Sequence, residues 1–292
     1  MKKGSIGGWF MLLIIIVLLA LALYFSYLLY LDFGSEPVQL VINDTFQEDR
    51  RILINDSIDE IGPSYSEEPQ FYPNMRFSSN RISYTIAKTC SREKINRMKG
   101  AFDKLEKETV LKFYSSRKGK IRISCSEKKV DREVPGHYFV AGEGGPTEIV
   151  NTSLFYVVEE GDILLLYEKS GCENYNVELH ELLHVLGFKH SNNENSIMYN
   201  TTSCNQELTR DIISRLNNLY SIKSRSDLYF VDISANKTGK YLNFNLEAKN
   251  QGLKASRDVK LELYHTNEEN EREEFRTFDL EDIGYGEAKE FT

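Results

Sequence analysis

The spacing of apolar and polar residues changes several times along the chain of 292 residues. An uncharged apolar run extends from Trp9 to Leu31, and no sustained period follows it as far as about residue 75. Strand-like and helix-like segments then succeed one another, and strand-like alternation alone follows. We therefore divide the chain into an N-terminal tail at 1–8, an apolar segment at 9–31, a stalk at 32–75, a mixed domain at 76–224 and a β domain at 225–292.

In the mixed domain, alternation predicts strands, and apolar residues spaced by three or four predict helices. The expected strands cover 81–87, about 110–115, 120–125, the neighbourhood of 148–151, and 162–167, and the expected helices cover 91–109, 176–187 and 207–220. Ser91 is a suitable N-cap for the first helix. The glycine-rich residues from Gly142 to Pro146 indicate a loop. This mixture of strands and helices predicts the α+β class.

The β domain shows four alternating segments, at 229–233, 241–247, 259–264 and 274–278. Short alternating strands with turns between them are typical of an all-β sandwich. About 66 residues follow Ser226, fewer than the ~100 of a complete sandwich. The sequence therefore leaves open that this sandwich is incomplete.

The apolar segment 9–31 has the length of a membrane-spanning helix. Its about 23 residues would extend roughly 35 Å as a helix, enough to cross the hydrocarbon core. Lys2-Lys3 before it favours a cytoplasmic N-terminus, with the rest of the chain outside. Ala20–Ala22 resembles a signal-peptide cleavage site, but the apolar run continues beyond the usual length of a signal core. We expect an uncleaved transmembrane anchor, with a cleaved signal peptide as the alternative, and both place the remaining domains outside the cytoplasm.

The charge of the chain bears on its partners. The net charge is −8, from 36 Lys and Arg against 44 Asp and Glu. Nucleic-acid binding requires a basic surface that replaces counterions on the phosphates. We therefore expect no nucleic-acid partner.

Three of the five histidines lie close together, at His180, His184 and His190. On a helix, the first two are about one turn apart and point the same way. Gly187 can adopt a positive φ and end the helix, so that the chain turns and brings the third histidine back. Three imidazoles suit zinc and leave a fourth position for water, and the neighbouring Glu181 can accept the proton of that water. The spacing predicts a catalytic zinc site with Glu181 as general base.

The segment from His180 to His190 reads His-Glu-x-x-His-x-x-Gly-x-x-His, and Ser196–Tyr199 holds Met198 at the place of a Met-turn. This pattern resembles that of the metzincin zinc metalloproteases. Ser191, directly after the third histidine, makes the matrixin family the nearest branch. The resemblance covers roughly residues 71–222. It implies a metzincin-type zincin catalytic domain with a mixed sheet, an active-site helix and a C-terminal helix.

The resemblance also implies one catalytic zinc ion, a peptide or protein substrate, and a structural role for Met198 beneath the metal. It implies that the backbone of Glu148, Ile149 and Val150 pairs with an extended peptide, with an ordinary edge strand as the alternative. The cysteine that occupies zinc in latent matrixins has no counterpart in residues 32–89. The ligand pattern of the calcium and structural zinc sites of vertebrate matrixins is not recognisable, so a requirement for calcium is unknown.

All four cysteines follow the apolar segment, at Cys90, Cys125, Cys172 and Cys204. An even number of cysteines in an exported chain predicts two disulfides, for which three pairings exist. Cys172 lies just before the expected zinc-binding helix and Cys204 just after the Met-turn, so both approach one site. We therefore predict Cys172–Cys204 and Cys90–Cys125, and four free buried cysteines are the alternative.

The C-terminal segment resembles the cell-adhesion-related (CARDB-like) β-sandwich domains of prokaryotic surface proteins. The resemblance is carried by Asp227–Ile233, Lys249–Gly252 and Val259–Tyr264. It implies that this segment is a spacer or a binding module.

These expectations combine into a membrane-anchored, extracytoplasmic zinc-dependent metalloendopeptidase. Zinc-activated water would hydrolyse peptide bonds, with Glu181 as general base. One alternative is a surface adhesion or binding protein on a zincin fold that does not hydrolyse, and another is a zinc hydrolase of non-peptide amides. The presence of Glu181 argues against the first alternative, because a site without catalysis would tolerate its loss.

Overall fold

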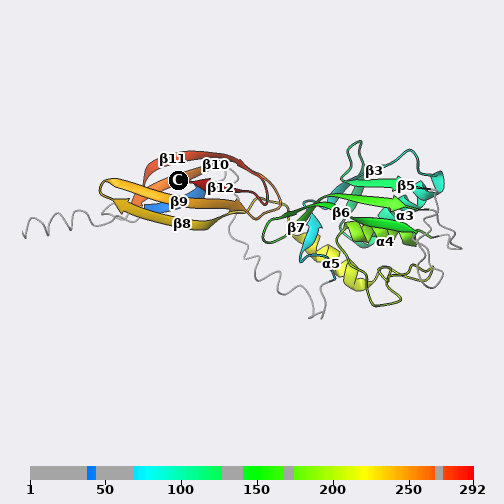
Figure 1. Cartoon of the computed structure of the whole chain (residues 1–292). Coiled ribbons are helices and arrows are strands. Elements are labelled where there is room, and N and C mark those ends of the chain that lie inside the picture. The colour runs from blue at the N-terminus through cyan, green and yellow to red at the C-terminus, as the bar shows by residue number, and fades with distance from the viewer. Residues whose placement is uncertain (1–37, 44–68, 127–140, 167–173, 267–271) are drawn as a thin grey trace, which may run out of the picture. The chain divides into compact units, whose positions relative to one another are not determined.

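The computed structural model of the chain describes residues 38–43, 69–126, 141–166, 174–266 and 272–292. Within them, the part that contains the three histidines is built on a mixed six-stranded sheet (Figure 1). Its strands are β2 (Met75–Phe77), β3 (Arg81–Ile86), β4 (Lys112–Ser115), β5 (Ile121–Cys125), β6 (Gly142–Asn151) and β7 (Tyr156–Leu165). The order is β2–β7–β5–β3–β4, and β6 pairs with β7.

Strand β6 differs from the others in direction. The pairings of β2, β3, β4, β5 and β7 with one another are parallel, whereas β6 is antiparallel to β7. Among the described strands, β7 is the one that pairs with β6. The opposite edge of β6 therefore carries the backbone groups of an edge strand.

Helices cover one face of this sheet (Figure 1). They are α3 (Arg92–Glu108), α4 (Asn176–Val185) and α5 (Arg210–Ser221). Residues of all three helices belong to one buried apolar cluster with Ile121 and Ile123 of β5, whereas Arg122 between them is exposed. This alternation follows from the pleat of a strand, and it fixes which face of the sheet supports the helices. The sheet and its helices confirm the α+β class.

The start of α3 is capped as its sequence predicts. The Ser91 side chain accepts a hydrogen bond of 3.3 Å from the backbone amide of Lys94, which satisfies one of the free donors of the first turn. Met98, Phe102 and Leu105 are buried, as their helical spacing requires.

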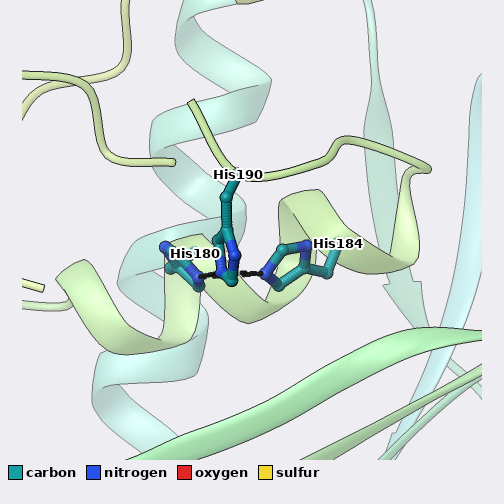
Figure 2. A group of neighbouring side chains, drawn as sticks. All are labelled: His180, His184 and His190. Carbon is teal, nitrogen blue, oxygen red and sulfur yellow. Dashed lines mark hydrogen bonds between the residues drawn. The ribbon is translucent and has the colours of Figure 1, made fainter. Parts of the chain in front are cut away.

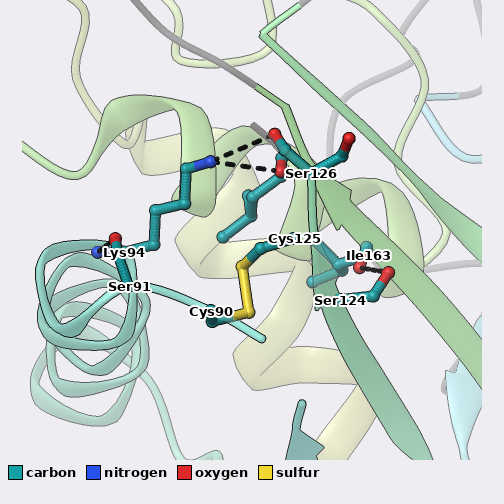
Figure 3. The surroundings of a disulfide bond; sticks show 8 residues. Cys90, Ser91, Lys94, Ser124, Cys125, Ser126 and Ile163 are labelled. Atoms are coloured by element: carbon teal, nitrogen blue, oxygen red, sulfur yellow. Dashed lines mark hydrogen bonds between the residues drawn. A yellow bond between two sulfur atoms is a disulfide. The ribbon is translucent and has the colours of Figure 1, made fainter. Parts of the chain in front are cut away.

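A disulfide joins the start of α3 to the end of β5 (Figure 3). It links Cys90 to Cys125, which confirms this predicted pairing. Beside it, the ammonium group of Lys94 donates to the carbonyl oxygens of Ser126 at 3.4 Å and Leu165 at 3.5 Å. The helix is thereby tied covalently and by hydrogen bonds to the ends of β5 and β7.

The second predicted disulfide involves a residue that is not described. Cys204 is disulfide-bonded, which excludes a free thiol there. Cys172 lies outside the described residues. The pairing of Cys172 with Cys204 therefore stays a prediction.

Two segments that we expected to be irregular are ordered parts of the domain. Strand β6 begins at Gly142 rather than near residue 148, because Gly142 to Pro146 pair in register with β7. Gln70 is fully buried and forms an antiparallel bridge with Phe188, and the buried Met75 opens β2. Residues 70 and 75, at the end of the predicted stalk, are therefore buried and paired with the mixed domain, and the boundary between stalk and domain stays a prediction. Neither segment has a local apolar period that would predict a strand. Both segments are extended because they pair with distant parts of the chain.

Past residue 226, the described residues form strands and no helix, as expected. One sheet has the order β12–β9–β8, and another has the order β1–β10–β11. The strands are β1 (Val38–Asn43), β8 (Leu228–Thr238), β9 (Tyr241–Asn250), β10 (Ser256–Thr266), β11 (Arg272–Ile283) and β12 (Ala288–Phe291). β1 lies antiparallel to β10, so part of the expected stalk is a strand of this second sheet. The packing of the two sheets into a sandwich stays a prediction.

In the part of the chain that the structure describes, no helix is long and apolar enough to cross a membrane. The apolar segment 9–31, in which we predict the anchor, lies outside that part.

Candidate active site

Helix α4 supplies the first two histidines of the candidate site. Every residue of this helix is buried, including His180 and His184. The helix ends at Val185, and two residues later Gly187 has a φ of 96°, where an added Cβ would lie 2.7 Å from Sδ of Met75. A residue with a side chain would be strained in this backbone conformation and would also meet its neighbour. Gly187 therefore lets the chain leave the helix and return with His190, as we predicted.

The three imidazole rings converge on one point (Figure 2). Nε2 of His184 lies 3.0 Å from Nε2 of His180 and 3.1 Å from Nε2 of His190. The third separation, between Nε2 of His180 and of His190, is 3.3 Å. Ligands at ~2.05 Å from a tetrahedral zinc ion would be about 3.3 Å apart, so these separations suit the edges of a zinc site.

The other ring nitrogen of two histidines indicates the tautomer. Nδ1 of His180 donates to the carbonyl oxygen of Ile197 at 2.7 Å, and Nδ1 of His184 donates to that of Phe188 at 2.8 Å. With the proton on Nδ1, the neutral ring presents its lone pair at Nε2. Lone pairs that face one another repel unless a cation lies between them. The donor set therefore fits a zinc ion.

Electrostatics keeps the rings neutral. Burial, and after it the neighbouring His180, lowers the pKa of His184 to about 4. Burial also lowers the pKa of His180 and of His190. Neutral imidazoles at neutral pH are the form that binds a metal.

The predicted Met-turn supports this group. Met198 is buried, and its backbone carbonyl oxygen accepts a hydrogen bond of 2.7 Å from the amide of Ser191, the residue after the third histidine. The amide of Met198 in turn donates to the hydroxyl oxygen of Ser196 at 3.2 Å. The turn thus fixes the segment that carries His190, and its Ile197 carbonyl orients His180.

Glu181 lies against β6, and this contact was not expected from the sequence. An added Cβ on Gly142 would lie 2.7 Å from Cγ of Glu181, and an added Cβ on Gly144 would overlap the backbone carbonyl of Glu181. Alternate residues of a strand share a face, so these two glycines let the strand approach the helix closely. The glycines at positions 142 and 144 are the sequence signal for this contact, but glycine also favours a loop, and the prediction of a loop for Gly142 to Pro146 is wrong.

The surroundings of Glu181 perturb its acidity. Burial and, after it, the charges of Glu143 and Glu178 raise the pKa of this carboxyl to about 8, although a hydrogen bond from the backbone amide of Gly144 acts to lower it. A divalent cation held by the imidazoles would favour the carboxylate. Glu181 is therefore a buried acid that can hold or release a proton near neutral pH.

The predicted substrate strand lies further along β6. Ile149 and Val150 pair with Val158 and Val157 of β7, with a register irregularity at Glu148. Ile149 packs against the main apolar cluster, so its side chain is not available to a partner. The part of β6 next to Glu181 is Gly142–Gly144.

A family match covers the part of the chain that holds this site. No curated protein matches the chain. One similar solved structure is High choriolytic enzyme 1 (HCE-1), a hatching enzyme zinc-protease from Oryzias latipes (medaka fish), with 16% sequence identity and a TM-score of 0.34, over 50% of this chain and 92% of that chain. The matrixin family matches residues 76–221, which is half of the chain and includes all three histidines, Glu181 and Met198. The chain belongs to the matrixin family, and its catalytic domain is that of a zinc metalloprotease.

Proposed function

We propose that the chain is an endopeptidase that hydrolyses internal peptide bonds of extracytoplasmic proteins, with Glu181 as general base. The observation that carries this proposal is the convergence of three Nε2 atoms beside a buried carboxyl group on the same helix. A zinc ion bound by His180, His184 and His190 would lower the pKa of a water molecule and polarise the peptide carbonyl.

The residues of the chain then account for the proton transfers. Glu181 accepts a proton from the attacking water while a bond forms between the water oxygen and the carbonyl carbon. The same carboxyl donates that proton to the amine nitrogen as the C–N bond breaks. The Gly144 amide orients the carboxylate through its hydrogen bond. Nδ1 of His180 and Nδ1 of His184 keep their protons and donate them in hydrogen bonds to backbone carbonyl oxygens, so these protons take no part in the transfer.

The edge of β6 that pairs with no other described strand is the proposed place for the peptide. Its backbone groups can add an extended chain to the sheet. The Gly142–Gly144 segment lies beside Glu181. The peptide would pair with this segment and, further from Glu181, with the backbone of Glu148, Ile149 and Val150. Backbone pairing of this kind gives affinity with little demand on side chains, which suits a protein substrate.

Removal of the metal tests the proposal. We expect the purified chain to cleave an unstructured protein at internal bonds, to lose this activity in a chelator, and to regain it when zinc is added back. Mass spectrometry of the products separates internal cleavage from release of terminal residues. Activity that is unchanged in the chelator, or a refolded chain that retains no zinc, would contradict the proposal.

Gly144→Ala is expected to lower kcat/KM by about 10- to 100-fold with zinc content unchanged, because a small displacement of reacting groups has effects of this size. The added methyl group would overlap the backbone carbonyl of Glu181, which cannot turn aside as a flexible side chain can. Gly145→Ala is the matched control, because nothing lies within 4 Å of an added Cβ at that position. Peptide kinetics and metal analysis of the two variants are compared with the parent, and equal rates for both variants would refute a close role for β6.

We further propose that segment 9–31 is an uncleaved anchor and that the C-terminal strands form a CARDB-like spacer or binding module. The uncharged run and Lys2-Lys3 before it support an N-terminus in the cytoplasm. Protease treatment of intact cells is then expected to remove the catalytic domain, with a protected fragment left from the N-terminus. A mature N-terminus near Leu23 would instead identify a cleaved signal peptide.

A further inference from the structure

The hairpin formed by β6 and β7 is in contact with residues that follow the matrixin match. The β8–β9–β12 sheet belongs to the same compact unit of the chain as the six-stranded sheet. Phe155 and Val157 of the hairpin form a buried apolar cluster with Leu253, and Ile222 and Tyr285 pack against this cluster. The last three residues lie beyond the matched residues 76–221. The core of the hairpin is therefore built from both parts of the chain.

This cluster lies on the face of the hairpin that points away from the helices. Ile149 and Val158 pair with each other and belong to the apolar cluster of the helices, whereas their neighbours Val150 and Val157 pair with each other and belong to the second cluster. Successive side chains of a strand point to opposite faces. Protein thus covers both faces of this end of β6, and its edge towards the proposed peptide lies between them.

The turn between β11 and β12 packs against the end of β6. Gly286 in this turn has a φ of 77°, and an added Cβ there would lie 2.5 Å from Cγ1 of Val150 and 3.1 Å from the carbonyl oxygen of Asn151. Val150 and Asn151 are the last two residues of β6. A side chain at position 286 would therefore strain the turn and push against the strand.

Polar contacts reinforce this junction. The hydroxyl group of Tyr285 donates to the carboxylate of Glu159 in β7, which also accepts a hydrogen bond of 2.9 Å from the ammonium group of Lys120. Burial and the hydrogen bond to Glu159 raise the pKa of Tyr285, so its hydroxyl keeps the proton that it donates. The hydroxyl oxygens of Ser153 and Tyr229 lie 3.4 Å apart, so the turn of the hairpin also meets β8.

Asn250 links the parts of the C-terminal segment that touch the hairpin. This residue is fully buried, and its backbone carbonyl oxygen accepts a hydrogen bond of 2.8 Å from the amide of Gly286. Its side-chain amide donates to the carbonyl oxygens of Ile283 at 3.0 Å and Lys254 at 2.9 Å. The β11–β12 turn and the segment that carries Leu253 are therefore fixed to each other.

We propose that the β8–β9–β12 sheet is a fixed part of the catalytic unit, in which Leu253 and Gly286 hold the β6–β7 hairpin in position for pairing with the substrate. They are positioning residues, because they contact the hairpin and not the metal ligands or the reacting atoms. A strand that is held in place before binding loses less conformational freedom when a peptide pairs with it. This inference rests on the proposed endopeptidase function and on the pairing of a peptide with β6.

The first test compares Gly286→Ala with Gly239→Ala in the full chain. Both glycines have a positive φ, so alanine strains the backbone at both positions, but nothing lies within 4 Å of an added Cβ at position 239. We expect Gly286→Ala to raise KM by about 5- to 10-fold for a peptide long enough to pair with all of β6, as for the loss of one backbone hydrogen bond, with kcat and zinc content unchanged. Gly239→Ala is expected to keep the KM of the parent.

A shortened peptide makes this result specific to the junction. A peptide that reaches only Gly142–Gly144 does not extend to Val150, so its KM should be the same in Gly286→Ala and in the parent. A general loss of stability would instead affect long and short peptides alike. Hydrogen exchange of the amides at 150–157 adds a readout that is independent of activity, and it should be faster in Gly286→Ala than in Gly239→Ala.

The second test uses two leucines of equal burial. Leu253 and Leu246 are both 3% exposed, but Leu246 lies in β9 and does not belong to the cluster with Phe155 and Val157. Replacement by alanine leaves a cavity at either position. Only Leu253→Ala is expected to raise KM for the long peptide and to speed exchange in the hairpin. If Gly286→Ala does not fold, this pair of variants decides by the same measurements.

Equal KM values for the long peptide within each pair of variants overturn the proposal, and so does an equal rise in KM for long and short peptides. Loss of zinc from Leu253→Ala also overturns it, because the junction would then support the metal site and not the substrate strand. A parent that cleaves no peptide overturns the proposed function and the positioning role together. An active parent whose variants match their controls overturns the positioning role alone.

Discussion

Replacement of Glu181 by alanine is expected to lower the rate of peptide hydrolysis by roughly 10²–10⁴-fold, the usual contribution of a general base. Zinc content should stay at about one ion per chain, because the proposed protein ligands are the three imidazoles and do not include this carboxyl group. The carboxyl group lies against Gly142 and accepts a hydrogen bond from the amide of Gly144, so it is placed to handle a proton and is not one of the converging nitrogen atoms.

Two further variants make this result specific. Glu181→Gln keeps the shape of the side chain and an acceptor for the Gly144 amide, yet it cannot accept the proton, so its rate should also fall. Glu194→Ala changes an exposed acid between the third histidine and the Met-turn, and it should leave both rate and zinc unchanged. Metal analysis beside the cleavage of an unstructured protein provides the measurement. If an active parent and Glu181→Ala cleave equally fast, the mechanism is wrong. If the parent itself is inactive, the result supports the alternative of a binding protein that does not hydrolyse.

The three-histidine group could be predicted from the sequence because its members are close together in the chain. His180 and His184 are joined by a single helical turn, and Gly187 is followed three residues later by His190. Local backbone geometry is enough to bring such residues together. The structure adds the carbonyl partners of the Nδ1 atoms, which come from Ile197 and Phe188 and fix the tautomers.

Strand β6 could be predicted only in part, because its conformation depends on distant partners. Gly142 to Pro146 resemble a loop in composition, since glycine and proline are poor strand formers. Their extended form comes from pairing with β7 and from the close approach to Glu181, which glycine alone permits. The same argument applies to Gln70, whose burial depends on hydrogen bonds to Met75 and Leu186 rather than on any periodic pattern.

The pairing of β1 with β10 is even less predictable from local sequence than the conformation of β6. Val38–Asn43 alternates like a short strand, but nothing in its own sequence identifies a partner more than two hundred residues away. The alternation of a strand determines which of its faces is buried, but it does not determine which distant strand it pairs with. Local pattern therefore predicts that a strand exists here and leaves its sheet undetermined.

Replacement of His184 by alanine is expected to abolish both zinc binding and hydrolysis. His184 is the central member of the group, since its Nε2 lies 3.0 Å from that of His180 and 3.1 Å from that of His190. Loss of an outer partner of a zinc ligand already costs about 10- to 100-fold in metal affinity, so loss of the ligand itself should cost more than that. Two imidazoles and water would then hold the metal too weakly for it to survive dialysis.

The comparison with Glu181→Ala separates the two roles, because only the histidine variant should lose the metal. His265→Ala, a change of a histidine in β10, serves as the matched control and should keep both zinc and activity. Elemental analysis after dialysis gives the metal content, and circular dichroism shows whether each variant retains its fold. A folded His184→Ala chain that retains a full complement of zinc would rule out this residue as a ligand. In that case the three-histidine site, on which the mechanism depends, would have to be abandoned.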